Sequence, residues 1–170
     1  FGAVQFYKYA TELGVKPIIG YEAYVAAESR FDRKQGKGLD GGYFHLTLLA
    51  QNMEGYQNLS RLASRAYLEG FYGKPGIDRE ILREHNAGII ALSGCLGAEI
   101  PQFILQERFE EAEKRLQEYL AIFGPERYFI EIQNHGLAEQ HKVNRVLKEF
   151  ADKYGLGLVA TNDGHYVRKE

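Results

Sequence analysis

The sequence predicts an α/β fold in which a parallel sheet is covered by helices, in one domain over residues 1–170. Short apolar runs typical of strands alternate with longer stretches whose apolar residues recur at helical spacing, and this alternation is typical of parallel sheets. The 170 residues, 45% of them hydrophobic, also suffice to bury a core without disulfide bonds.

The first half of the chain is expected to hold two helices, two strands and one long loop. Gly14 ends the first helix, because glycine is common just after a helix C-terminus. Pro17 stands near the start of the first strand, where its missing N–H costs least. The expected elements are a helix over 4–13, a strand over 16–27, a charged, glycine-rich loop over 28–42, a strand over 43–50 and a helix over 53–71.

The second half repeats this alternation. Asp78 is expected to cap a short helix, because an aspartate side chain accepts hydrogen bonds from the first turn. A glycine-rich turn follows the next strand, and Gly124 and Pro125 break a later helix. The expected elements are a helix over 79–85, a strand over 88–92, a turn over 93–97, helical sequence through 105, a helix over 109–123, a strand over 128–133, a helix over 139–154 and a strand over 156–161.

Composition excludes several classes of protein. There are 21 Lys and Arg residues against 23 Asp and Glu, a net charge of −2, which argues against nucleic-acid binding by bulk electrostatics. The single cysteine excludes a disulfide scaffold, and no apolar run approaches the ~20 residues that span a bilayer. We therefore expect a cytoplasmic protein with no membrane partner. The chain begins at Phe1 rather than methionine, and we interpret it as a fragment.

Potential metal ligands occur at or near the ends of the predicted strands, where the chemistry of parallel α/β proteins is found. Carboxylate, imidazole and thiolate groups are the ligands that zinc, manganese and iron accept. An Asp-x-His step after the last strand can place both side chains on one side of an extended segment. The candidate ligands are Glu22, His45, Cys95, Asp163 and His165, and His135 follows a further strand end.

Each of these residues also has a structural interpretation. Glu22 could be solvated on an edge strand, His45 could be a satisfied core residue, and Cys95 a small buried hydrophobe. Asp163 and His165 lie in an Asn-Asp-Gly sequence that favours a turn, and the Asn-His-Gly sequence around His135 does so too. From the residues alone, both interpretations stay open.

Read together, the sequence strings around these residues resemble the PHP (polymerase and histidinol phosphatase) domain of bacterial replicative DNA polymerase III alpha subunits. The resemblance runs through almost the whole chain, and the strings occur in the same order. They are GVKPIIGYEAYV at 14–25, YFHLTLLA at 43–50, YLEGFY at 67–72, ALSGCLGAEI at 91–100, IEIQNHG at 130–136 and VATNDGHY at 159–166.

The resemblance implies a partial, distorted β/α (TIM-like) barrel that binds divalent metal ions at its strand ends. The metal would be zinc, with manganese or magnesium as alternatives. The family's N-terminal His-x-His and Thr-Asp-His-Gly motifs do not occur in this chain, so the domain is expected to be incomplete at its N-terminus. The family's ligand positions map onto Glu22, His45, Cys95, Asp163 and His165, with His135 in a supporting position.

The resemblance also implies a function for the parent protein, a DNA-directed DNA polymerase of DNA replication. The complete PHP domain would be a metal-dependent phosphoesterase that acts as a 3′–5′ proofreading exonuclease on a DNA primer terminus. Two alternatives are a non-catalytic platform that stabilises the polymerase and docks a separate proofreading subunit, and a phosphatase for a small phosphate ester. The expected partners are the remaining polymerase domains and other replisome subunits, and these 170 residues alone are expected to be inactive.

Overall fold

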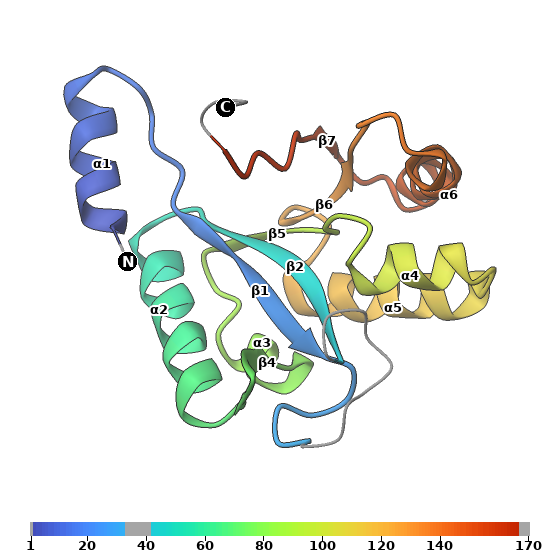
Figure 1. The fold of residues 1–170 in the computed structure, drawn as a ribbon, viewed down its shortest axis with the longest axis horizontal. Helices are drawn as coiled ribbons and strands as arrows, with labels where there is room; N and C mark the ends of the chain where they lie inside the picture. The colour runs from blue at the N-terminus through green and yellow to red at the C-terminus, as the bar shows by residue number, and fades with distance from the viewer. Residues whose placement is uncertain (1, 33–41, 167–170) are drawn as a thin grey trace.

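The computed structural model describes residues 2–32 and 42–166, and Figure 1 shows their arrangement. Helices and strands alternate along most of the chain, as predicted. The helices are α1 (Ala3–Glu12), α2 (Met53–Leu68), α3 (Arg79–Glu84), α4 (Glu99–Leu105), α5 (Phe109–Phe123) and α6 (Ala138–Tyr154). The strands are β1 (Gly20–Ala26), β2 (Tyr43–Ala50), β3 (Phe71–Tyr72), β4 (Lys74–Ile77), β5 (Ile89–Leu92), β6 (Tyr128–Ile132) and β7 (Leu158–Ala160).

The described strands form one mixed sheet in the order β3-β4-β1-β2-β5-β6-β7. Strand β2 runs antiparallel to both of its neighbours, β1 and β5, whereas β5, β6 and β7 are parallel to one another and β1 is parallel to β4. The predicted all-parallel sheet is therefore wrong at β2. Strands β1 and β2 are consecutive and pair directly along their length, and such pairs are generally antiparallel because parallel pairs need a long crossover connection.

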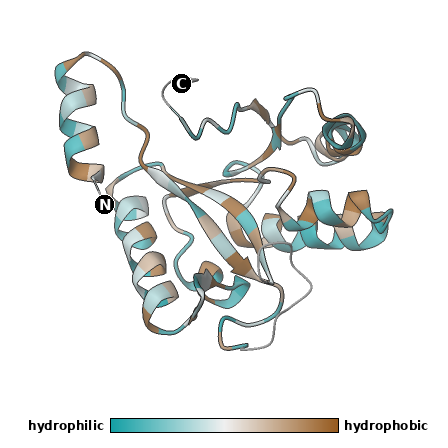
Figure 2. Cartoon of the chain, in the orientation of Figure 1, coloured by the Kyte–Doolittle hydropathy of each residue, from teal (hydrophilic) through white to brown (hydrophobic). Residues whose placement is uncertain are grey.

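One face of this sheet packs against helices and forms the core. In Figure 2, hydrophobic and hydrophilic bands alternate along β1 and β2 and on α4 and α5. The described sheet is open, with β3 and β7 as its edges. An open sheet with helices on one side is a partial β/α barrel, which confirms the predicted fold class. Core residues on the strands and helices are Ala23, Val25, Leu46, Leu48, Leu62, Ile89, Ala91, Leu116, Tyr128, Ile130 and Leu147.

Two element boundaries differ from the prediction. The helix expected over 53–71 ends at Leu68, and the β3–β4 hairpin follows it, where no strand was predicted. Gly70 permits this because a Cβ there would lie 1.9 Å from the Gly76 carbonyl oxygen, and Gly73 makes the hairpin turn with a φ of +73°. Residues 16–19, expected to start the first strand, lie before β1 in irregular chain. No helix in the described ranges is long and apolar enough to cross a membrane.

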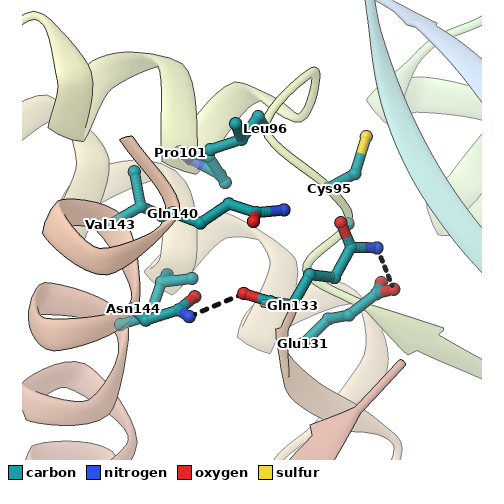
Figure 3. Close-up of a pocket in the computed structure, with 10 residues that line it drawn as sticks. Cys95, Leu96, Pro101, Glu131, Gln133, Gln140, Val143 and Asn144 are labelled. Carbon is teal, nitrogen blue, oxygen red and sulfur yellow. Dashed lines mark hydrogen bonds between the residues drawn. The ribbon is translucent and has the colours of Figure 1, made fainter. Parts of the chain in front are cut away.

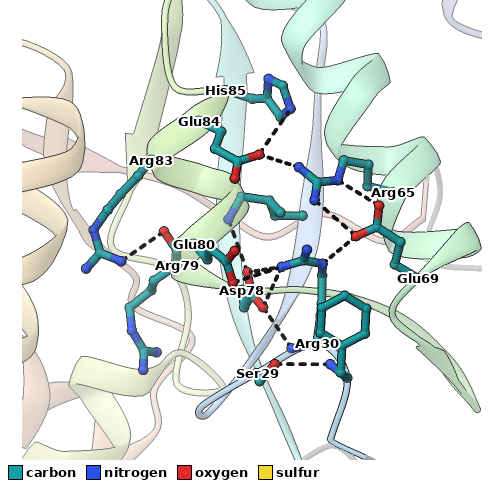
Figure 4. Close-up of polar contacts among 12 residues, drawn as sticks. Ser29, Arg30, Arg65, Glu69, Asp78, Arg79, Glu80, Arg83, Glu84 and His85 are labelled. Atoms are coloured by element: carbon teal, nitrogen blue, oxygen red, sulfur yellow. Dashed lines mark hydrogen bonds and ion pairs between the residues drawn. The ribbon is translucent and has the colours of Figure 1, made fainter.

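A buried ion pair fixes the chain after β1 to the start of α3 (Figure 4). Arg30, only 3% exposed, places its Nη1 atom 2.9 Å from Asp78 Oδ2 and its Nε atom 2.6 Å from Glu69 Oε2. The Arg30 backbone N–H donates to the same Asp78 carboxylate, and Asp78 Oδ1 accepts a hydrogen bond from Ile81 N, as the predicted helix cap requires. Residues 33–41 of the predicted loop lie outside the described residues.

A second buried acidic group stands in the first turn of α4. Glu99 is 2% exposed, and its carboxylate lies 2.9 Å from Arg115 Nε and 3.4 Å from Arg79 Nη1. The Tyr119 hydroxyl donates a hydrogen bond to the same carboxylate. Burial raises the pKa of the Glu99 carboxyl to about 7, because the charged form loses hydration, and the two arginines only partly offset this effect.

The raised pKa of the Glu99 carboxyl predicts that the free energy of unfolding depends on pH. Folding raises its pKa from 4.5 to about 7, so the folded state binds the proton more tightly, and the stabilisation is full below pH 4.5 and lost as pH rises toward 7. The loss is on the order of 3 kcal/mol. A Glu99→Gln variant should escape it, so urea unfolding should show the variant gaining stability relative to wild type between about pH 5 and about pH 8. Parallel pH profiles for the two proteins would contradict this assignment.

Candidate metal centre

The face of the sheet opposite the core carries polar side chains. Residues that pair directly across antiparallel strands lie on the same face, and β1 and β2 pair Glu22 with Thr47 and Tyr24 with His45. These positions alternate with the core residues Ala23 and Leu46 on the same strands. Because β2 is reversed, His45 lies near the start of its strand, yet still beside the end of β1 and the end of β5.

Three of the predicted ligands meet on this face. The carboxylate Oε1 of Glu22 lies 2.5 Å from His45 Nδ1, and Cys95 Sγ lies 3.5 Å from the same nitrogen. One ligand atom from each residue falls within 4.8 Å of the others. The Glu22 side chain is 42% exposed and that of His45 is 23% exposed, so the cluster is open to solvent on its carboxylate side. Oxygen, nitrogen and sulfur donors at this separation suit zinc.

The loop after β5 brings Cys95 to this cluster. The Gly97 N–H donates to Cys95 Sγ at 3.3 Å, and the Gly97 carbonyl accepts from the backbone N–H of His45 at 3.1 Å. A Cβ on Gly97 would lie 3.0 Å from His45 Nδ1, so glycine lets the loop approach the imidazole closely. Gly94 supports the same turn with a φ of +86°, in the left-handed region that glycine tolerates.

Asp163 and His165 lie on the segment that follows β7. Within the described ranges they do not join the group formed by Glu22, His45 and Cys95. The His165 Nδ1 atom is 2.8 Å from the Asp163 carbonyl oxygen, and Asp163 has a φ of +46°. The contact with this carbonyl raises the pKa of His165, and the negative charges of Asp163 and Glu22 raise it further. Of the three clustered residues, Glu22 is the one whose charge acts on His165.

His135 lies between α6 and the segment after β7. Its Nδ1 atom is 2.9 Å from Gln140 Nε2, an amide donor, and its Nε2 atom is 2.9 Å from the carbonyl oxygen of Asn162. Gln140 Oε1 accepts from the His135 backbone N–H at 2.7 Å. With these partners, Nδ1 accepts from the Gln140 amide and Nε2 donates to the Asn162 carbonyl. In the described structure His135 thus binds the segment that carries Asp163 rather than the cluster itself.

The sequence reading missed several polar residues on this face. Glu131, 5% exposed, accepts hydrogen bonds from Thr161 Oγ1 at 2.5 Å and from Gln133 Nε2 at 3.2 Å. Thr47 Oγ1 donates to the other carboxylate oxygen at 3.4 Å. The available signal was a carboxylate at the centre of an apolar strand, because an unpaired buried charge is very costly.

The fold and the site together define the class of this protein. It is an open β/α barrel with acid, imidazole and thiol groups gathered on the face of the sheet opposite the core. The family model of the PHP domain matches residues 1–135, and the chain belongs to this family. Its sequence is 82% identical to the DNA polymerase III subunit alpha of Thermus aquaticus and 58% identical to that of Deinococcus radiodurans, each over 170 residues. The corresponding protein of Aquifex aeolicus is 41% identical over 174 residues.

These matches cover nearly all of the chain but little of each relative. The alignments include 99–100% of this chain and 13–15% of the three relatives, so the chain spans about one-seventh of their length. The relatives are named as polymerase subunits, and the family assignment for this chain is the PHP domain.

Proposed function

We propose that this PHP domain, at its natural length, is a metal-dependent phosphoesterase whose ligands include Glu22, His45, Cys95, Asp163 and His165. The observation that supports this most directly is the meeting of Glu22, His45 and Cys95, whose ligand atoms lie within 4.8 Å of one another. When bound, a divalent cation such as zinc would lower the pKa of water and stabilise negative charge on a phosphate oxygen. Manganese and magnesium are the alternative ions.

The chain's own residues would hold such an ion with complementary donors. Glu22 supplies a carboxylate that is open to solvent, and His45 supplies an imidazole fixed between β1 and the Gly97 loop. The Gly97 N–H donates to Cys95 Sγ and so fixes the position of the sulfur beside His45. The exposed side of the cluster leaves room for a phosphodiester to approach.

We further propose that the natural-length protein is a replicative DNA polymerase alpha subunit of the cytoplasm. The matches of nearly the whole chain to part of subunits of that name support this proposal. The substrate of the PHP domain would be the primer terminus of DNA, cleaved in the 3′–5′ direction as a proofreading step. The remaining polymerase domains and other replisome subunits would be its partners.

The first test is metal content, measured by plasma mass spectrometry on the protein at its natural length. We expect more than one bound ion per chain in the wild type and fewer in an Asp163→Ala/His165→Ala variant. His141→Ala, on the exposed face of α6, should bind metal as the wild type does. A 3′-labelled DNA strand and p-nitrophenyl phosphate would then separate a nuclease from a phosphomonoesterase.

The opposite result is equally informative. A folded protein that binds no metal, even after incubation with zinc or manganese, would contradict the phosphoesterase. It would favour the platform function, in which the domain stabilises the polymerase and docks a separate proofreading subunit.

A further inference from the structure

The buried residue Glu131 contacts three different segments that carry the candidate ligands, two through its carboxylate and one through its backbone. Its side chain accepts hydrogen bonds from Thr47 Oγ1 on β2 at 3.4 Å and from Thr161 Oγ1 after β7 at 2.5 Å. Its backbone N–H donates to Ser93 Oγ, after β5, at 2.9 Å. Glu131 therefore bonds to β2, to the Cys95 loop and to the segment of Asp163 at once.

The three partners stand at the same spacing from candidate ligands. Thr47 is two residues after His45, Ser93 is two residues before Cys95, and Thr161 is two residues before Asp163. His45 and Thr47 point to the same face of strand β2, because residues two apart in extended chain do so. In the other two pairs only one residue separates the partner from the ligand, so a bond to the partner limits where the ligand can lie. Contacts at Glu131 thus set how the three segments lie relative to one another.

Neighbouring residues reinforce this arrangement. Gln133 Nε2 donates both to Glu131 Oε1 and to Thr161 Oγ1, and Asn144 of α6 holds the Gln133 carbonyl at 2.8 Å. Figure 3 shows Glu131, Gln133 and Cys95 on the same side of a small pocket, with dashed lines for the Glu131–Gln133 and Gln133–Asn144 bonds. Two positions further along, His135 bonds to the Asn162 carbonyl. Glu131 and Gln133 therefore hold Thr161, and His135 holds the next residue of the segment that leads to Asp163.

The choice of a carboxylate at this site has a physical consequence. An ionised carboxylate only accepts hydrogen bonds, so the hydroxyl protons of Thr47 and Thr161 must point toward Glu131. An apolar residue at 131 would remove the acceptor of both threonine hydroxyls and one of the two acceptors of the Gln133 amide. Burying a charge is costly, and packing alone would be satisfied by an apolar side chain of this size.

We propose that Glu131 is a positioning residue, which holds the segments of His45, Cys95 and Asp163 in the relative placement that a metal ion requires. This inference rests on the proposed metal site. Glu131 lies outside the group of Glu22, His45 and Cys95 and acts through Thr47, Ser93 and Thr161. Supporting residues of this kind typically change metal affinity 10- to 100-fold when they are altered.

The test compares Glu131→Leu, Glu131→Gln and Thr161→Val in the protein at its natural length. Thr11→Val is the matched control, because the Thr11 hydroxyl bonds only to the Tyr7 carbonyl on exposed helix α1 among the contacts described. Zn²⁺ affinity is measured by competition with a chromogenic chelator, and hydrogen–deuterium exchange is measured on the metal-free proteins. Thermal unfolding reports whether each variant is folded.

We expect Glu131→Leu and Thr161→Val to bind Zn²⁺ roughly 10- to 100-fold more weakly. Glu131→Gln keeps one carbonyl acceptor and should recover part of this loss. In the metal-free variants, exchange should accelerate over residues 161–165, and Thr11→Val should match the wild type in both measurements. If the folded Thr161→Val variant keeps wild-type affinity and wild-type exchange, the positioning role is wrong.

The two proposals fail in different ways. A wild type that binds no Zn²⁺ contradicts the proposed function. The hydrogen–deuterium exchange data still decide whether the Glu131 side chain holds residues 161–165 in place. A wild type that binds Zn²⁺ tightly, together with variants that do the same, contradicts only the role of Glu131. If Glu131→Leu is unfolded, the partly exposed Thr161 site supplies the decisive variant.

Discussion

Replacing Asp78 with alanine is expected to lower the free energy of unfolding by about 3–5 kcal/mol, the typical cost of removing one partner from a buried ion pair. Asp78 is 1% exposed and Arg30 is 3% exposed, so the guanidinium loses its best-buried counter-charge. The same substitution removes the cap that accepts from Ile81 N and the acceptor for the Arg30 backbone N–H. Urea denaturation followed by circular dichroism measures the change.

A matched control lies two residues away. Glu80 also approaches Arg30, at 3.5 Å, but its side chain is 67% exposed, so Glu80→Ala should change stability by no more than about 0.5 kcal/mol. Asp78→Asn keeps a side-chain oxygen for the cap and should lose less than Asp78→Ala. Equal losses for Asp78→Ala and Glu80→Ala would show that burial of the pair does not set its strength.

Replacing His45 with alanine is expected to weaken Zn²⁺ binding by more than about 100-fold, since even residues that only support a ligand cost 10- to 100-fold. The His45 Nδ1 atom is the common neighbour of Glu22 and Cys95, so its removal leaves the carboxylate and the sulfur without the group between them. Competition with a chelator at neutral pH gives the affinity, and Co²⁺ absorption reports whether sulfur still binds.

The control for this prediction is His141→Ala on the exposed face of α6, which removes an imidazole away from the cluster. Its Zn²⁺ affinity should equal that of the wild type. Should His45→Ala retain wild-type affinity while Co²⁺ shows no thiolate band, the ion would have to bind elsewhere, and the cluster of Glu22, His45 and Cys95 would not be the site.

Local signals in the sequence predicted most elements but not the direction of one strand. Periodicity and capping predicted the helices well, for example the Asp78 cap and α5 over Phe109–Phe123. Strand direction depends on which neighbours pair, a property that no single segment carries, and β2 is reversed. The β3–β4 hairpin was also missed, because it rests on a close approach of Gly70 to Gly76 that is visible only in three dimensions.

Only part of the candidate site was predicted, because the site also depends on which segments become neighbours in three dimensions. Glu22, His45 and Cys95 meet as expected, although His45 arrives from the start of its strand because β2 is antiparallel. That Asp163 and His165 act as ligands stays a prediction. Glu131 escaped notice because its meaning comes from contacts with residues 84, 38 and 30 positions away, and nothing in its own neighbourhood resembles a motif.

Those separations also bear on the order in which the molecule is made. Ribosomes add about 5–20 residues per second, so Thr47 and Ser93 exist before Glu131, whereas Thr161, 30 residues later, follows after roughly 2–6 seconds. Pairings between distant residues form late in folding, because the intervening chain must first lose its freedom. We therefore expect the nascent chain to hold an incomplete centre until β7 joins the sheet. A bound ion would then mark a domain in which β7 has joined.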